Sequence, residues 1–143
     1  MSADLFPARL PLKILIHGYT LNHDLSPNVE LRPLLLQQQN TYVISVDYSP
    51  LSRLGCYFPW AVQNARLVGK CLAQLLNNLM DQGVYGPNDI HIIGFSLGGQ
   101  VAGLAANYLN TKIGRITGKN CIRFEVSAEL LRTPLCNRLG SSW

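Results

Sequence analysis

Short hydrophobic runs that stop at turn residues are the first pattern along the chain. Lys13–Ile16 stops at a His-Gly pair, and the stretch TYVISVDYSP is rich in strand-forming residues and closes at Pro50. Ile90–Ile93 follows a segment with two glycines and a proline. Runs this short, with β-branched residues and turn residues at their ends, are typical of buried strands. We therefore predict three strands here and a fourth over KIGRIT, residues 112–117.

A longer periodicity separates these runs. From Pro59 onward, apolar or small residues recur at steps of three and four, which predicts a helix of about 20 residues that begins near this proline. A second helix is predicted over Gln100–Leu109, in a segment whose many glycines and alanines fit close packing against a sheet. Between the first two strands, Pro27 and Pro33 bracket weakly helical patterning.

The order strand, connection, strand, helix, strand, helix, strand predicts the α/β class. Helical crossovers between strands imply a mostly parallel sheet with helices on both faces. In such sheets, functional groups collect beyond the carboxyl ends of the strands. His17, Asp47 and Ser96 each follow a predicted strand, so we expect them at the same edge of the sheet.

Composition narrows the range of functions. The chain of 143 residues has room for one domain with a hydrophobic core. Its net charge of +4 comes from scattered basic residues without an aromatic-basic module, so nucleic-acid binding is not expected. No apolar run approaches the roughly 20 residues that span a bilayer, and the four cysteines are not spaced as in a zinc site. The start, MSADLFPARLPLK, lacks the pattern of a secretory signal peptide.

The motif GFSLG at residues 94–98 carries the candidate chemistry. It lies between a predicted strand and a predicted helix, which is the context that a nucleophile elbow requires. Ser96 is the candidate nucleophile, and Gly94 and Gly98 remove side chains that would collide at a sharp turn. The backbone N–H of Leu97 at the helix start and that of Tyr19 after the first strand are the candidate oxyanion donors.

All three histidines of the sequence precede Ser96, whereas the catalytic base of a fold with this serine motif follows the serine. His17 stands directly before a loop glycine and is interpreted as a residue that orients the turn, since the base follows the serine in this fold. His91 lies inside a predicted strand and is expected to be structural, and His23, in a polar loop, is expected to be solvated.

The segments ILIHGYT, VISVDYS, GPNDIHIIGFSLGGQVAG and GRITG resemble, in this order, the lipase family that includes pancreatic lipase, lipoprotein lipase and the insect lipases and phospholipases A1. The resemblance implies an α/β-hydrolase fold, a secreted protein, glycerolipid ester substrates at a lipid–water interface and no cofactor or metal. Carried over by position, it makes Ser96 the nucleophile and places Leu97 and Tyr19 at the oxyanion positions. Asp47 matches an aspartate that is not the family's triad acid.

The resemblance implies a triad acid directly after GRITG, where this chain has Lys119, Asn120 and Cys121. No histidine follows Ser96, so neither triad acid nor triad base is found. We therefore expect residues 1–118 to form the amino-terminal part of a lipase-type α/β-hydrolase domain, a partial fold truncated after the nucleophile helix and the next strand. Residues 119–143 are expected to be a divergent tail.

Three interpretations follow for function. The chain belongs to a lineage of ester hydrolases but is inactive alone, because loss of a triad base costs on the order of 10⁶ in turnover. Alternatively, it is a noncatalytic lipid-binding or yolk-type protein, or a truncated isoform without function. A retained serine motif favours the first interpretation over the second.

Overall fold

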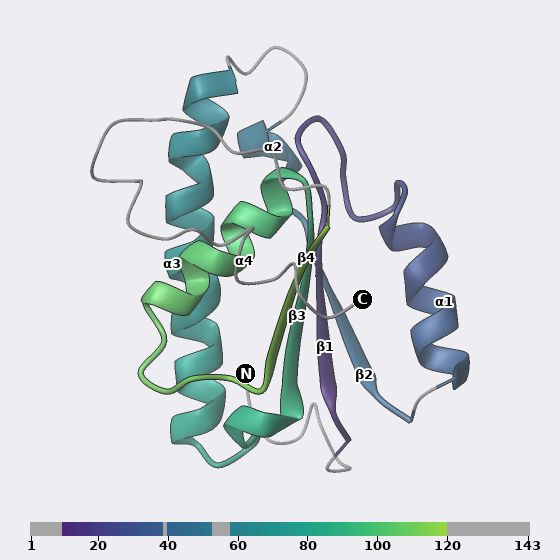
Figure 1. The fold of residues 1–143 in the computed structure, drawn as a ribbon, viewed down its shortest axis with the longest axis vertical. Coiled ribbons are helices and arrows are strands. Elements are labelled where there is room, and N and C mark those ends of the chain that lie inside the picture. Colours follow the sequence, from purple (N-terminus) through teal and green to yellow (C-terminus); the bar gives the residue numbers. More distant parts are fainter. Residues whose placement is uncertain (1–9, 39, 53–57, 120–143) are drawn as a thin grey trace.

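The computed structural model describes residues 10–38, 40–52 and 58–119, and these form a sheet with helices on both faces (Figure 1). The sheet has the order β2-β1-β3-β4, and each neighbouring pair is parallel. Its strands are β1 (Leu12–Ile16), β2 (Tyr42–Val46), β3 (Ile90–Phe95) and β4 (Arg115–Lys119). The helices are α1 (Asn28–Gln38), α2 (Ser49–Ser52), α3 (Phe58–Asp81), α4 (Leu97–Asn107) and the short 3₁₀ helix η2 (Pro87–Asp89). The predicted α/β class is confirmed.

The strand order places the candidate chemistry. The chain passes from β1 to β2 on one side and then crosses β1 to reach β3 on the other side. The direction of winding therefore reverses between β1 and β3, and ligands of open α/β sheets bind beyond the carboxyl ends of such strands. The residues that follow β1 and β3 begin at His17 and Ser96.

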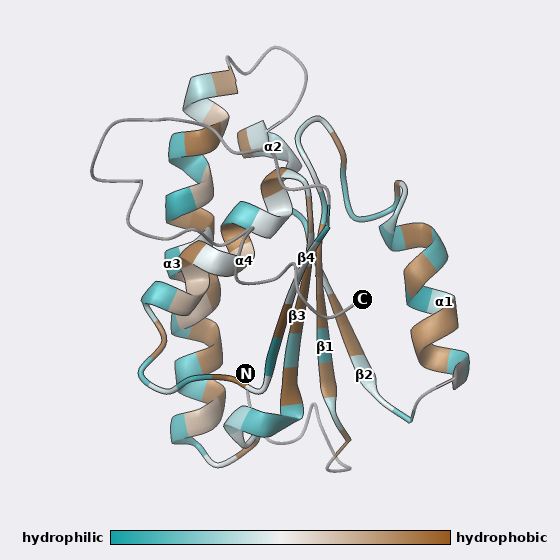
Figure 2. Cartoon of the chain, viewed as in Figure 1, coloured by the Kyte–Doolittle hydropathy of each residue, from teal (hydrophilic) through white to brown (hydrophobic). Residues whose placement is uncertain are grey.

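The main core lies between the sheet and the pair α3 and α4. In Figure 2 the strands β1, β2 and β3 are largely brown, that is, hydrophobic, whereas α3 alternates between brown and teal residues. From the sheet, Leu12, Ile14 and Ile92 are fully buried in this core. The buried positions of α3 recur at the predicted steps of three and four and include Ala61, Ala65, Val68, Leu72, Leu76 and Leu79.

Small residues allow α3 and α4 to pack closely. A Cβ added to Gly69 of α3 would lie 3.0 Å from the Ala105 backbone nitrogen and 3.0 Å from the Leu104 Cβ in α4. The glycine- and alanine-rich sequence of α4 is therefore explained by contacts on two sides. One side packs on α3, and the other packs on the sheet, as predicted.

Several boundaries differ from the sequence predictions. Helix α4 begins at Leu97 rather than Gln100, and β4 covers residues 115–119 rather than 112–117. Pro33 lies inside α1 instead of bounding it. The four-residue α2 and the three-residue η2 were not predicted, because helices of one turn carry no hydrophobic periodicity.

A matched pair of leucines in α3 tests the position of the core. Leu76 is fully buried, whereas Leu67 is 55% exposed. We expect Leu76→Ala to lower the unfolding free energy by about 2–5 kcal/mol, because the lost methyl groups leave a cavity. Leu67→Ala should change it by less than about 1 kcal/mol. Urea denaturation of both variants measures this difference, and equal losses would contradict the proposed packing face.

Candidate active site

The turn between β3 and α4 holds Ser96 in an unusual backbone conformation. Its φ is 51° and its ψ is −118°, and it is the residue directly before α4. A non-glycine residue with positive φ costs on the order of 1–3 kcal/mol and persists only where the surrounding structure enforces it. Strain of this kind is typical of functional sites. The sharp strand-to-helix turn predicted for GFSLG is present.

Two glycines make this turn sterically possible. A Cβ on Gly94 would overlap the backbone of Gly98 and Gly99, and a Cβ on Gly98 would overlap the carbonyl oxygens of Ile16 and His17. The first clash lies within the turn, and the second lies between the turn and β1. The glycines therefore let the start of α4 approach both its own strand and the end of β1.

The loop after β1 lies directly against Ser96. A Cβ added to Gly18 would be 3.3 Å from the Ser96 Cβ, a tight contact that a larger residue could make only if the neighbouring atoms shifted by a few tenths of an ångström. Thr20 has a φ of 62°, and its N–H donates to the Ser52 carbonyl oxygen at 2.9 Å. The Tyr19 ring meets the Phe58 ring edge-on, with centroids 4.9 Å apart. Residues 18–20 are therefore held in contact with both Ser96 and the α2–α3 region.

The amino-terminal end of α4 begins at Leu97, the residue predicted to give one oxyanion donor. The N–H groups in the first turn of a helix point outward along its axis and carry partial positive charge. The Ser96 N–H donates to the Lys119 carbonyl oxygen at 2.8 Å, which ties the turn to the end of β4. Lys119 thus belongs to β4, one residue beyond the boundary predicted at Gly118.

His17 is buried and bonded to its surroundings through both ring nitrogens. Its Nδ1 lies 2.9 Å from the Gly18 carbonyl oxygen, and its Nε2 accepts from the Tyr48 N–H at 3.1 Å. Asp47 Oδ1 is 3.3 Å from the same Nε2. Burial lowers the pKa of His17, outweighing the hydrogen bonds that would raise it, and this favours a neutral ring. These contacts agree with the interpretation of His17 as a residue that orients the turn.

Asp47 and His23 form part of a surface network. His23 Nδ1 lies 2.9 Å from Asp47 Oδ2, and its Nε2 lies 3.1 Å from Asp24 Oδ2. Burial alone would raise the Asp47 pKa, but the surrounding contacts, led by hydrogen bonds from Ser49 and then His23, outweigh it and lower this pKa to about 2. His23 is half exposed, which agrees with the prediction of a solvated side chain, but its ring is also paired with two carboxylates, which the sequence did not indicate.

His91 is structural, as predicted. Its Nε2 is 2.9 Å from the Thr117 hydroxyl on the neighbouring strand β4. All three histidines of the sequence are therefore engaged by groups other than Ser96.

Comparison with known proteins decides the family. The lipase family model matches residues 2–137. Hepatic triacylglycerol lipase of Bos taurus is 35% identical over 116 residues, pancreatic triacylglycerol lipase of Myocastor coypus 37% over 122, and lipoprotein lipase of Neovison vison 33% over 107. The chain belongs to the lipase family. The alignments cover 79%, 84% and 73% of this chain but only 23%, 26% and 22% of the three relatives.

This lipase-family chain thus spans about a quarter of the length of the relatives that it matches. The four-stranded parallel sheet with flanking helices corresponds to a partial α/β-hydrolase fold, as the resemblance implied. The family match continues past Gly118, so the separate tail over residues 119–143 stays a prediction. Asn120 and Cys121, two of the residues at the expected acid position, lie outside the described residues.

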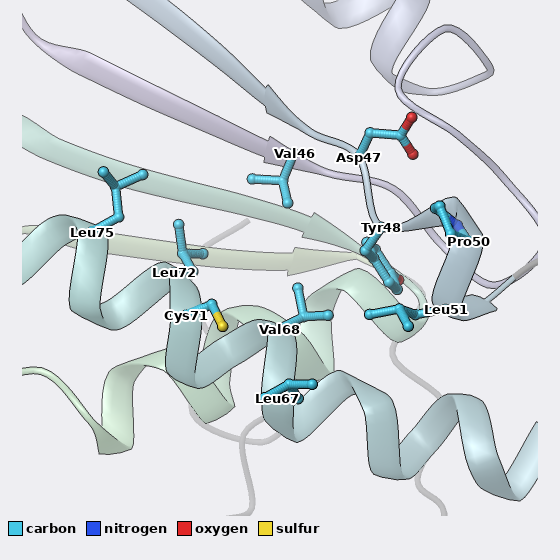
Figure 3. A pocket seen from close by; sticks show the side chains of 10 residues that line it. All are labelled: Val46, Asp47, Tyr48, Pro50, Leu51, Leu67, Val68, Cys71, Leu72 and Leu75. Carbon is cyan, nitrogen blue, oxygen red and sulfur yellow. The ribbon is translucent and has the colours of Figure 1, made fainter. Parts of the chain in front are cut away.

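Hollows lie on both faces of the sheet in this lipase-family chain. One, of about 350 Å³, adjoins Gly94 and Phe95, directly before Ser96, and is also lined by α1 residues such as Leu31. The other, of about 410 Å³, lies between α3 and the segment after β2 (Figure 3). Its lining is mostly apolar, and Figure 3 shows the Asp47 carboxylate turned away from α3.

The described ranges contain neither a metal-ligating cluster nor a membrane-spanning helix. Among residues 10–38, 40–52 and 58–119, no three His, Cys, Asp or Glu side chains gather to hold a metal ion. None of the helices in these ranges combines the length and apolar character that crossing a bilayer requires.

Sequence reasoning missed two residues of this site, Tyr48 and Thr20. Tyr48 is 3% exposed and contacts His17, whereas Thr20 adopts positive φ two residues after Gly18, which contacts Ser96. An aromatic residue directly after Asp47 at a strand end was a usable signal for Tyr48. No local pattern in the sequence indicates the conformation of Thr20.

The close approach at Gly98 predicts a large effect of one methyl group. Gly98→Ala should lower the unfolding free energy by about 1–3 kcal/mol, because the turn or β1 must move to admit the Cβ. The control is Gly86→Ala, whose Cβ would meet only the end of the Asp89 carboxylate and should cost less than about 1 kcal/mol. Urea denaturation measures both, and an alanine tolerated equally at the two positions would contradict the contact.

Histidines with depressed pKa values predict a pH dependence of stability. Burial, with smaller contributions from Lys13 and Arg115, lowers the pKa of His91 to about 4, and burial also lowers the pKa of His17. Between pH 6.5 and pH 4 the unfolded chain binds protons that the folded chain does not, so the unfolding free energy falls as the pH decreases. We expect the urea midpoint to drop across this window, and to drop less in His91→Gln. If His91→Gln leaves the pH dependence of the urea midpoint unchanged, the lowered pKa of His91 is contradicted.

Proposed function

We propose that this chain carries the nucleophile and the oxyanion donors of a glycerolipid ester hydrolase. The observation that supports this most strongly is the positive φ of Ser96 at the β3–α4 turn, with the loop after β1 packed against it. Ser96 is the nucleophile in this proposal. The backbone N–H groups of Leu97 and Tyr19 are the oxyanion donors, and Gly94 and Gly98 permit the turn.

In the proposed reaction, Ser96 Oγ attacks the acyl carbonyl carbon while its proton passes to a base. The carbonyl oxygen becomes an oxyanion, and the Leu97 and Tyr19 N–H groups would stabilise it. The ester C–O bond then breaks, the alcohol leaves with a proton, and an acyl-enzyme remains. Water attacks this intermediate, releases the fatty acid and regenerates the serine.

The base for this reaction is not among the histidines of the printed sequence. Each of the three histidines is engaged by another group: His17 by the Gly18 carbonyl oxygen, His23 by the Asp47 carboxylate and His91 by the Thr117 hydroxyl. No histidine follows Ser96 in the printed sequence. Without the base, turnover by a serine hydrolase falls by about 10⁶, leaving roughly 10³–10⁴ over water. We therefore propose that these 143 residues alone hydrolyse esters very slowly, and that a base supplied from outside them raises the rate.

The proposed substrate is a glycerolipid ester, presented at a lipid–water interface outside the cell. Two of the relatives are triacylglycerol lipases by name. The apolar hollow of about 350 Å³ beside Gly94 and Phe95 suits an apolar chain. Trp60 is 64% exposed, two residues after the Phe58 that contacts Tyr19, and an exposed tryptophan at this edge suits contact with a lipid surface.

A noncatalytic lipid-binding role is the second candidate. It is favoured by the same exposed Trp60 and by the histidines that are engaged elsewhere. The two candidates differ in their dependence on the Ser96 hydroxyl, because lipid binding does not require it.

Chemical rescue tests the proposed function. Imidazole is a small base that can take the place of a missing histidine, so added imidazole should raise hydrolysis of an activated ester by the chain about tenfold or more above the imidazole blank. Ser96→Ala should abolish this increase. Thr111→Ala, which removes a hydroxyl from an exposed turn, should leave it unchanged. An increase that survives in Ser96→Ala, or no increase in the parent chain, would contradict the proposed function and favour lipid binding.

A further inference from the structure

The peptide group between Gly18 and Tyr19 is oriented by a side chain. In a planar trans peptide, the C=O and the N–H point in opposite directions. His17 Nδ1 lies 2.9 Å from the Gly18 carbonyl oxygen, and the Leu21 N–H donates to the same oxygen at 3.3 Å. Because these contacts hold the Gly18 C=O, they also fix the direction in which the Tyr19 N–H points.

This orientation requires one tautomer of His17. For Nδ1 to donate to the Gly18 oxygen, it must carry the proton, and Nε2 must then carry a lone pair. The Tyr48 N–H donates to Nε2 at 3.1 Å, which satisfies that lone pair. The nearby Asp47 carboxylate does not need an Nε2 proton, because it accepts from the Ser49 N–H at 2.9 Å and contacts His23. The neutral Nδ1–H form therefore satisfies the ring at both nitrogens.

Tyr48 makes two more contacts with His17. Its hydroxyl donates to the His17 carbonyl oxygen at 2.7 Å, and the two rings stack with centroids 4.2 Å apart and an interplanar angle of 10°. The Tyr48 side chain is almost fully buried and lines the hollow between α3 and the segment after β2 that Figure 3 shows. A Cβ on Gly98 would overlap the same His17 carbonyl oxygen. The Tyr48 hydroxyl therefore donates its hydrogen bond at the point where the end of β1 contacts the start of α4.

We propose that Tyr48 is a positioning residue for oxyanion stabilisation. Its N–H sets the His17 tautomer, and its hydroxyl and ring fix the His17 peptide and imidazole, so that the Tyr19 N–H is aimed at the oxyanion. This inference rests on the proposed function, in which Tyr19 is a donor. It adds a residue that acts through its contacts with His17 on the geometry of the donor.

Tyr48→Phe separates this role from simple packing, because it removes the hydroxyl and keeps the ring. We expect kcat for imidazole-assisted ester hydrolysis to fall about tenfold with KM unchanged, since a misaimed donor weakens binding of the transition state alone. The matched control, Tyr108→Phe, removes a hydroxyl from a half-exposed side chain at the far end of α4 and should change neither constant. A Tyr48→Phe variant with parent kcat, or with only KM raised, would overturn the proposal.

Nitrogen-15 NMR of the parent chain tests the same proposal without activity. The His17 ring should appear at neutral pH as the Nδ1–H tautomer, and Tyr48→Phe should shift the Tyr19 amide signal and speed exchange of the Thr20 amide hydrogen. An Nε2–H tautomer or a charged ring would overturn the proposal, as would Tyr19 and Thr20 amides that do not respond. This measurement stands even where Tyr48→Phe is too unstable for kinetics, because the tautomer is read in the parent.

Substitutions of His17 provide a further check. An asparagine amide places an N–H close to the position of Nδ1, whereas a glutamine amide reaches the position of Nε2. We expect His17→Asn to retain more of the imidazole-assisted rate than His17→Gln, and the reverse order would contradict the proposal. Ser96→Ala is measured alongside: if it hydrolyses as fast as the parent, the proposed function has failed, and the NMR results alone decide whether Tyr48 orients the loop.

Discussion

The close backbone approach of the β3–α4 turn to the end of β1 is the constraint on which the rest of the site depends. At Gly94 and Gly98 a single added carbon would overlap backbone atoms of the turn or of β1. Main-chain atoms cannot rotate away as side chains do, so the contact fixes the path of the chain. Ser96 lies between these glycines, and its positive φ is the conformation that the path requires.

The sheet topology brings the candidate functional groups to this contact. Because the strand order reverses at β1, the loop after β1 and the turn after β3 meet at one edge of the sheet. The hydroxyl of Ser96, the amino-terminal end of α4 and the Gly18–Tyr19 peptide are thereby brought together from segments about 80 residues apart. The Tyr48 contacts then stabilise the loop from the side of β2.

The sequence was most informative where one local pattern determines the structure. The buried stripe of α3, the short strands and the serine turn all follow from spacing or from residue size at neighbouring positions. It was least informative where a partner lies far away along the chain. The Tyr48 hydroxyl bonds a carbonyl 31 residues earlier, and His23 finds Asp47 24 residues later. Hydrophobic periodicity does not indicate such long-range pairs.

In the proposed function, Ser96 is shaped for acyl transfer but depends on a base from outside the printed residues. The most direct measurement is peptide mass spectrometry of the chain after reaction with a fluorophosphonate, with and without imidazole. In this reaction the serine oxygen displaces fluoride from phosphorus, and imidazole takes the proton. We expect one phosphonyl group on Ser96 when imidazole is present and little labelling without it. Label scattered over other hydroxyl groups, or an unlabelled Ser96 in the presence of imidazole, would contradict it.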